Sequence, residues 1–364
     1  MADTLSLVTA LARDLVSIDS RSFVSNLAVA DRVEAALAGF EVERIDYVDP
    51  AGVAKRALVA ARGGAGGIAF SGHMDTVPDT GWQDDPWSAR VEGDVLHGLG
   101  STDMKGPVAA IIVAAQALPA VTLLITTDEE TSKQGAREIV ARSRLAPRMR
   151  PRGIIVAEPT GMAPVRGHRA QIGFTCEARG VQAHSSTGRG ENANWRLLPF
   201  LVEMRGVFDR LRSDRALQDV AYDPPFSDFN LVIDNHGAAT NVTVPLATAR
   251  LKFRYSAGID PSPVLAAVRD AAARHGVRVA EASEGAPPEL PAEHPLVRLC
   301  TDVTGKAAGT APYGTDASVL QELAPCVVFG PGDIGVAHAP GESASLTELA
   351  DAVAMFRRLA KAET

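Results

Sequence analysis

Imidazole and carboxylate side chains, which commonly bind divalent metal ions, follow short apolar stretches at several places in this sequence. The set comprises His73, Glu130, Glu158 and His338, which follow such stretches, and Asp103, which lies in a Gly-flanked loop just ahead of an alanine-rich segment. Two imidazoles and three carboxylates suit a pair of divalent ions bridged by one carboxylate, with a water or hydroxide between the ions. Because the set contains no thiolate, it favours zinc, although cobalt or manganese would also fit. The chemistry expected of such a centre is metal-assisted hydrolysis.

Taken one at a time, these residues would not predict a metal site. A single histidine such as His73 or His338 is more often a hydrogen-bonded loop residue, and an adjacent pair such as Glu129-Glu130 is more often solvated. The prediction depends on convergence of the side chains. In open α/β sheets, ligands bind beyond the carboxyl ends of the strands, so the stretches before these residues must be neighbouring strands.

The first half of the chain has the pattern of a mostly parallel sheet covered by helices on both faces. Wholly apolar stretches at 68–70, 121–126 and 154–156 predict buried strands. Residues 106–118 are too many and too rich in alanine for a strand, and Pro107 suits a first helical turn, so we expect a buried helix there. The α/β class follows from this alternation.

An inserted α+β module interrupts the pattern. The segments from Gln171 to Val279 predict the order strand, helix, strand, strand, helix, strand: 171–178, 192–211, 230–233, 249–255, 264–274 and 277–279. After a Pro- and Gly-rich passage the earlier pattern returns, with a helix near 296–304 and a strand at 326–329. We therefore expect a catalytic metal-binding domain of residues 1–166 and 281–364, interrupted by a domain of residues 167–280.

Composition argues against several classes of protein. No apolar run reaches the roughly 18 residues of a membrane helix, and the amphipathic start lacks the basic leading region of a targeting segment. The formal net charge of −8 argues against a nucleic-acid partner. Cys176, Cys300 and Cys326 are odd in number and far apart, which suits a reducing cytoplasm. We expect a cytoplasmic protein with neither a nucleic-acid nor a membrane partner.

Seven segments resemble, in order, motifs of the dinuclear zinc amidohydrolases that include acetylornithine deacetylase, succinyl-diaminopimelate desuccinylase, aminoacylase and the glutamate-releasing carboxypeptidases. They are SGHMDTVP (71–78), GLGSTDMKG (98–106), TTDEE (126–130), AEPT (157–160), GVQAHSS (180–186), NVTVP (241–245) and GPGDIGVAH (330–338). Any one motif alone would be weak evidence, but together they extend over nearly the whole chain. Glu158 and the last motif are most similar to the deacetylase and desuccinylase branch. Leu99 departs from the arginine usual in the family.

The resemblance implies a role for each metal ligand. Asp103 would bridge the two ions, with His73 and Glu158 completing one site and Glu130 and His338 the other. Precedent in the family also implies a cis peptide bond between the bridging aspartate and the residue after it.

The resemblance also implies the catalytic residues. Glu129 would be the general base that takes a proton from the metal-bridging water and passes it to the leaving amine. Asp75 would accept the second imidazole N–H of His73. His184, in an inserted lid and dimerisation domain, would reach the partner subunit's active site and support the developing oxyanion. From its neighbours Ser185 and Ser186 alone, His184 would be interpreted as a surface turn residue.

Substrate-binding residues follow from the same comparison. Asn241 and Arg254 match lid positions that bind polar or carboxylate groups of the substrate, and an arginine suits bidentate capture of a carboxylate. Gly314 and Thr315 resemble the substrate-contact loop of the family.

We therefore expect a homodimeric deacylase of amino-acid biosynthesis that cleaves a small N-acyl amino acid, with N-acetylornithine-like substrates first. N-Succinyl-diaminopimelate, an acylated lysine or a dipeptide stays open as the substrate, because the motifs serve one chemistry and do not define the acyl pocket. An inactive metal-binding scaffold is the alternative from another class. Glu129 argues against it, because a structural metal site would not need a base.

Overall fold

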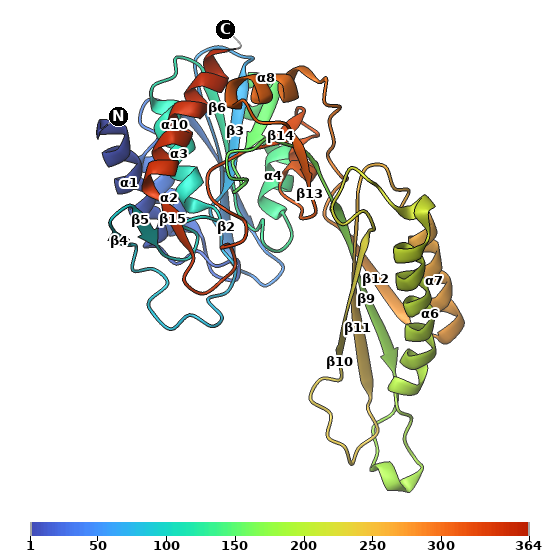
Figure 1. Ribbon diagram of the computed structural model, residues 1–364. Coiled ribbons are helices and arrows are strands. Elements are labelled where there is room, and N and C mark those ends of the chain that lie inside the picture. The colour runs from blue at the N-terminus through green and yellow to red at the C-terminus, as the bar shows by residue number, and fades with distance from the viewer. Residues whose placement is uncertain (1, 363–364) are drawn as a thin grey trace. The chain divides into compact units, whose positions relative to one another are not determined.

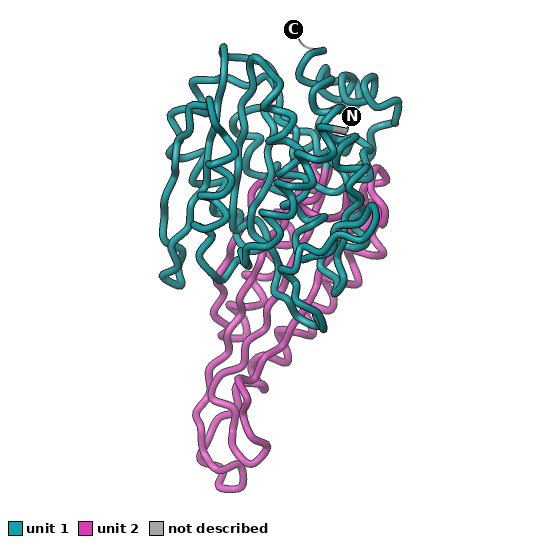
Figure 2. Tube along the Cα trace, turned by 90° about the vertical axis from the view of Figure 1, so that its left-hand side faces the viewer, with its two compact units in different colours: residues 1–167, 288–310, 315–364 teal, residues 168–287, 311–314 magenta. Residues whose placement is uncertain are grey.

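The computed structural model describes residues 2–362, which form two compact units (Figures 1 and 2). Among the described residues, unit 1 comprises 2–167, 288–310 and 315–362, and unit 2 comprises 168–287 and 311–314. The second boundary therefore follows residue 287, whereas the sequence suggested residue 280. The difference arises because the last strand of unit 2 continues to Ser283, and the next residue, Glu284, still donates its N–H to the Gln171 carbonyl.

Unit 1 is built on an eight-stranded sheet with the order β1-β2-β6-β3-β7-β14-β8-β13. Its centre is parallel and consists of β6 (Val121–Thr126), β3 (Ile68–His73), β7 (Gly153–Val156) and β14 (Cys326–Val328). The outer strands are β1 (Glu41–Val48), β2 (Ala54–Arg62), β8 (Val165–His168) and β13 (Gly309–Ala311). Of these, β1, β2 and β8 pair antiparallel. The central strands are buried along their whole length, which explains why their sequences are mostly apolar.

Helices cover both faces of this sheet (Figure 1). One face packs against α1 (Ala2–Val16), α2 (Leu27–Ala35), α3 (Lys105–Gln116), α8 (Pro295–Thr304) and α10 (Leu346–Lys361). The other face packs against α4 (Gln134–Arg142), α5 (Leu145–Met149) and α9 (Ala317–Leu320). Successive residues of a strand point to opposite faces of the sheet and pack against different layers of helices. Phe70 contacts Phe356 of α10 with ring centroids 5.2 Å apart, while Ala69 joins the second layer. The expected α/β architecture is confirmed.

A small three-stranded sheet in unit 1 has the order β15-β5-β4. It consists of β15 (Ser343–Ser345), β5 (Val95–His97) and β4 (Arg90–Glu92). The pairing of Ser343 with His97 joins the segment after His338 to the segment before Asp103. Two loops that are more than two hundred residues apart in sequence are thereby fixed beside each other.

Unit 2 has the expected strand and helix order. It runs β9 (Ala170–Arg179), α6 (Asn194–Ser213), β10 (Asp228–Asp234), β11 (Leu246–Tyr255), α7 (Ser262–His275) and β12 (Arg278–Ser283). Short 3₁₀ turns occur at Ser185–Thr187 and Arg215–Leu217. The four strands form an antiparallel sheet in the order β10-β11-β9-β12, and α6 and α7 cover one of its faces (Figure 1). Alternate residues of β9, such as Ile172 and Phe174, pack into the core under these helices.

Among residues 2–362, no helix has both the length and the apolar character needed to span a bilayer. Cys176, Cys300 and Cys326 are buried free thiols. Burial raises the pKa of the Cys176 thiol to about 12. That thiol is therefore protonated and unreactive near neutral pH.

Candidate metal centre

The carboxyl edge of the parallel strands brings the expected ligands together. His73 is the last residue of β3, Glu130 lies four residues after β6, and Glu158 lies two residues after β7. His338 belongs to the loop after β14, and Asp103 lies two residues before α3 begins at Lys105. Because β6, β3, β7 and β14 are parallel neighbours, the residues that follow them meet at one edge of the sheet.

Two groups of ligand atoms share Asp103. His73, Asp103 and Glu158 form one group, and Asp103, Glu130 and His338 form the other, with the atoms of each group within 4.8 Å of one another. The two carboxylate oxygens of Asp103 face different histidines. Oδ1 lies 3.0 Å from Nε2 of His73, and Oδ2 lies 3.2 Å from Nε2 of His338. Asp103 would therefore be the residue shared by two cations, if both groups held one.

The two groups differ in their access to solvent. In the first, the His73 side chain is 1% exposed, and its Nε2 lies 3.8 Å from Oε1 of Glu158. In the second, Nε2 of His338 lies 3.0 Å from Oε1 of Glu130, and the His338 side chain is 50% exposed. The first group is therefore enclosed, and the second opens to solvent through His338.

Electrostatics show that the donor set fits cations. Burial, and then the Asp103 charge, raise the pKa of Glu130 to about 8, and the same two causes raise the pKa of Glu158 above its ordinary value. Hydrogen bonds to Asp103 and Glu130 raise the pKa of His338 to about 11. Without a cation, the cluster therefore retains protons on carboxyl and imidazole groups near neutral pH, and divalent cations would displace these protons.

A buried glutamate, Glu342, holds the loop that carries Asp103. Its carboxylate accepts backbone N–H groups from Gly100 at 3.1 Å, Thr102 at 2.8 Å and Asp103 at 2.9 Å. The peptide bond between Asp103 and Met104 in this loop is cis, which confirms the expectation. Sequence reasoning missed Glu342. The sequence shows only an acidic residue four positions after His338, and its place beside the Asp103 loop follows from the pairing of β15 with β5 in the folded chain.

Asp75 does more than orient His73. Nδ1 of His73 lies 3.0 Å from the backbone carbonyl of Asp75 and 3.5 Å from its carboxylate. The carboxylate accepts the backbone N–H groups of Glu129 at 3.1 Å and Glu130 at 3.2 Å, and the Ser22 hydroxyl at 2.8 Å. Asp75 therefore also fixes the turn after β6, and Ser22 supports it from the loop after α1.

The turn after β6 contains further charged groups that sequence reasoning missed. Glu129 is buried, and its Oε1 accepts a hydrogen bond from Nζ of Lys133 at 2.6 Å. Asp128 forms a buried ion pair with Lys55 at 2.8 Å and accepts the Tyr47 hydroxyl at 2.7 Å. Lys133 is four residues from Glu129, but the segment between them is a turn and not a helix, so this spacing alone does not predict the pair.

The expected substrate residues occupy separate places. In unit 2, exposed His184 forms a bridge with Val242, beside the Asn241 carbonyl that accepts the Ser185 N–H. Arg254 lies near the other end of β11 and forms an ion pair with Asp228 at 2.8 Å. Unit 2 of one chain therefore brings His184 and Asn241 together but does not bring Arg254 to them.

The substrate-contact loop expected at Gly314 and Thr315 crosses the boundary between the units. Gly314 belongs to unit 2, whereas Thr315 is buried in unit 1. The next residue, Asp316, is also buried and accepts the Thr126 hydroxyl at 2.5 Å. Burial, and then the Glu129 charge, raise the pKa of Asp316 to about 7, so this carboxyl belongs to the environment of Glu129.

Comparison with known proteins identifies the family of the chain. Residues 69–362 match peptidase family M20/M25/M40, and the chain belongs to that family of metal-dependent hydrolases. A curated relative, acetylornithine deacetylase of Myxococcus xanthus, is 34% identical over 381 residues, which cover 98% of each chain.

Solved structures share the fold at low sequence identity. A metallo-carboxypeptidase of the M20 family from Sulfolobus solfataricus has a TM-score of 0.74 and 15% identity, over 97% of this chain and 98% of its own. A dinuclear metal-binding peptidase of the family from Bacillus subtilis has a TM-score of 0.65 and 14% identity, over 99% of this chain and 98% of its own. At these identities the likeness establishes the fold.

Proposed function

We propose that the protein hydrolyses the amide bond of a small N-acyl amino acid, with N-acetylornithine-like substrates first. The observation that carries the proposal is the bridging position of Asp103 between two ligand groups, next to the turn that holds Glu129. The deacetylase relative, 34% identical over almost the whole chain, supports this substrate class. N-Succinyl-diaminopimelate, acyl-lysine and dipeptides are the rival substrates.

The five ligand residues form two metal-binding groups that share Asp103. His73, Asp103 and Glu158 would hold one divalent ion, and Asp103, Glu130 and His338 would hold the other. We expect zinc, with cobalt or manganese as substitutes. When bound, such ions acidify a water and polarise the substrate carbonyl.

Glu129 accepts the proton of the attacking water and delivers it to the leaving nitrogen as the C–N bond breaks. Asp75 holds the Glu129 and Glu130 backbone in place for this step. In unit 2, Asn241 and Arg254 bind polar groups of the substrate, with Gly314 and Thr315 in the loop at the boundary of the units. The three buried free cysteines support a reducing, cytoplasmic setting, and amino-acid biosynthesis is the process that this substrate class suggests.

Unit 2 offers a surface for a second copy of the chain. β10 is an edge strand, and its Leu231, Val232 and Ile233 are exposed apolar side chains. The helix beside it exposes Trp195, which is 73% accessible. An apolar edge strand left open to water favours pairing with another strand.

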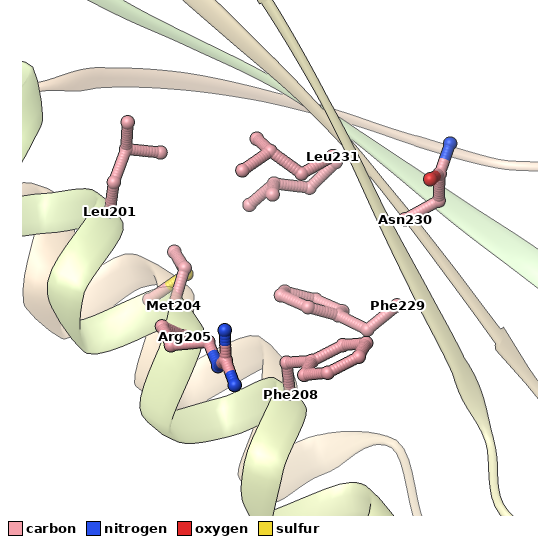
Figure 3. A pocket seen from close by; sticks show the side chains of 8 residues that line it. Leu201, Met204, Arg205, Phe208, Phe229, Asn230 and Leu231 are labelled. Atoms are coloured by element: carbon pink, nitrogen blue, oxygen red, sulfur yellow. The ribbon is translucent and has the colours of Figure 1, made fainter.

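A cavity of ≈ 300 Å³ lies between α6 and β10 (Figure 3). Leu201, Met204 and Phe208 line it from the helix, and Phe229 and Leu231 line it from the strand. This depression could receive an apolar side chain of the second copy. We therefore place the homodimer interface at β10 and α6.

The separation of His184 from Arg254 supports a site shared between two copies. His184 pairs with Val242, before β11 begins at Leu246, and Arg254 is the ninth residue of that strand. At about 3.3 Å per residue, Arg254 and Leu246 are roughly 26 Å apart. A small substrate cannot contact His184 and Arg254 of the same chain. If both bind it, one of them comes from the partner.

A hydrolysis panel tests the proposed function. Purified protein with measured metal content is assayed with acetylated, succinylated and lysine-acylated amino acids and with dipeptides. We expect the highest kcat/KM on an N-acetyl amino acid, and loss of turnover after chelation that added zinc restores. Full activity in metal-free buffer after chelation would contradict metal dependence. If a dipeptide or a succinylated amino acid had the highest kcat/KM of the panel, this result would contradict the proposed N-acetyl substrate.

A further inference from the structure

We propose that Lys133 is a positioning residue whose ammonium holds one oxygen of the Glu129 carboxylate and so directs the other oxygen toward the reacting groups. The inference rests on the proposed role of Glu129 as the base. Nζ of Lys133 lies 2.6 Å from Oε1 of Glu129, and the two side chains are 5% and 8% exposed. A contact this short between buried opposite charges restricts the rotation of the carboxylate much more than a solvated pair would.

The backbone of the turn after β6 is shaped to bring Lys133 back to Glu129. The Asp128 carbonyl accepts the N–H groups of Ser132 at 3.0 Å and Lys133 at 2.7 Å. Asp128 has a φ of 59° and Lys133 a φ of 55°, so both adopt the left-handed conformation. Glycine would adopt this conformation without strain, whereas a lysine does so at a cost. The backbone at Lys133 therefore has a conformation that is unfavourable for a lysine, although its side chain reaches Glu129 from there.

The charges around Glu129 explain why a cation is useful there. Buried carboxyl groups of Asp103, Glu130, Glu158 and Asp316 surround this edge of the sheet. The Lys133 charge opposes the rise in the pKa of Asp316 that burial and Glu129 cause. The Oδ1 atom of Asp316 is buried and accepts no hydrogen bond from the described residues. Lys133 thus supplies a positive charge to a region that contains several buried carboxyl groups.

The reaction needs this arrangement in two successive steps. In the first, a water oxygen bonds to the acyl carbon, and its proton passes to the free oxygen of Glu129. In the second, the C–N bond breaks and that proton passes to the nitrogen, which leaves as an amine while the acyl group leaves as a carboxylic acid. Lys133 keeps its proton throughout and donates to Oε1 in both steps, so that the same carboxylate oxygen receives and delivers the proton.

Lys133→Met tests the inference, with Lys306→Met as the control because Lys306 is an exposed lysine that binds a backbone carbonyl elsewhere in unit 1. We expect Lys133→Met to lower kcat roughly 10- to 100-fold, the cost of a misplaced catalytic group. KM and metal content should stay within about twofold of the wild type, and the control should be unchanged. Lys133→Gln, which keeps a neutral donor, should lose less activity and is measured as well in case the methionine variant does not fold.

A second measurement separates positioning from a direct contact with the substrate. If Lys133 acts through Glu129, then Lys133→Met should cause no further loss in a Glu129→Gln background. An unchanged kcat, an effect confined to KM, or additive losses in the double variant would each overturn the inference while leaving the proposed function intact. Wild-type protein that hydrolyses no amide of the panel would instead overturn the proposed function, and the inference with it.

Discussion

At the residue scale, the two adjacent glutamates after β6 face different partners, so substitutions of the two should have different effects. Glu129 faces the Lys133 ammonium, whereas Glu130 faces His338 and shares the second ligand group with Asp103. We expect Glu129→Gln to keep both metal ions and lose roughly 10²–10⁴-fold in kcat, because it removes proton transfer alone. Glu130→Gln should lose metal. Metal analysis and turnover measured on the same samples check this, and exchanged phenotypes would show that the two roles are reversed.

Glu342 should control metal affinity although it is not a ligand. Its carboxylate accepts three backbone N–H groups of the loop that carries Asp103, and a glutamine would place a donor among those donors. We expect Glu342→Gln to weaken metal binding about 10- to 100-fold, as loss of an outer-shell partner does. Competition with a chromophoric chelator measures the affinity. Exposed Glu322→Gln is the control, and equal affinity of the two variants would contradict the role of Glu342.

At the scale of elements, one buried lysine joins β2 to two loops around the site. Nζ of Lys55 forms an ion pair with Asp128 at 2.8 Å and donates to the carbonyls of Ser22 at 2.5 Å and Val24 at 2.9 Å. Lys55→Met would leave the buried Asp128 without its cation and the two carbonyls without their donor. We expect the free energy of unfolding to fall by about 3–5 kcal/mol.

Urea unfolding at equal metal saturation measures this loss, and an exposed ion pair provides the control. Arg44→Met removes the partner of Glu34 from the surface, where such pairs contribute less than about 1 kcal/mol. Lys55→Met and Arg44→Met variants of equal stability would show that burial of the Lys55 pair contributes nothing extra.

The elements also show what the sequence could and could not predict. Strands β3, β6 and β7 and helix α3 were predictable because each contains a mostly apolar run of residues that is buried. The hairpin of β1 and β2 was not identified, since β1 has charged residues and buries only Ile45. The metal ligands were found from strand ends and motifs.

Glu342, Lys133 and Lys55 were missed because their partners depend on the folded chain. Glu342 is 239 residues from Asp103, and Lys55 reaches a loop after a different strand. Lys133 is close to Glu129 in sequence, but only the left-handed turn brings the two side chains together. No local pattern of residues specifies such contacts.

At the scale of the whole molecule, the expected substrate residues of unit 2 lie too far apart to serve one site from one chain. His184 belongs to the loop after β9, and Arg254 lies near the opposite end of the neighbouring strand β11. The resemblance of the GVQAHSS segment to the family motif implies that His184 acts in the partner's site. Its exposed position, with Nδ1 2.8 Å from the Ser186 hydroxyl, leaves it accessible to a second chain.

Co-expression of two inactive variants tests this arrangement. Chains with His184→Ala and chains with Glu129→Ala should each be nearly inactive alone. In a mixed dimer, the His184→Ala chain still offers an intact Glu129 site, and its partner supplies an intact His184, so one site of two is restored. With random pairing about half of the dimers are mixed, so roughly a quarter of wild-type activity should return. If His184 acted within its own chain, every site would lack one group and no activity would return.

The matched control places both substitutions in one chain and co-expresses it with the wild type. If His184 acts in trans, neither site of the mixed dimer is complete, because the wild-type chain lacks its partner's histidine and the other chain lacks Glu129. Only wild-type dimers are then active, about a quarter of the total, whereas action within one chain would leave about half of all sites active. Separate affinity tags on the two chains confirm that mixed dimers form. Half activity in this control, together with no recovery in the first experiment, would place His184 in the site of its own chain.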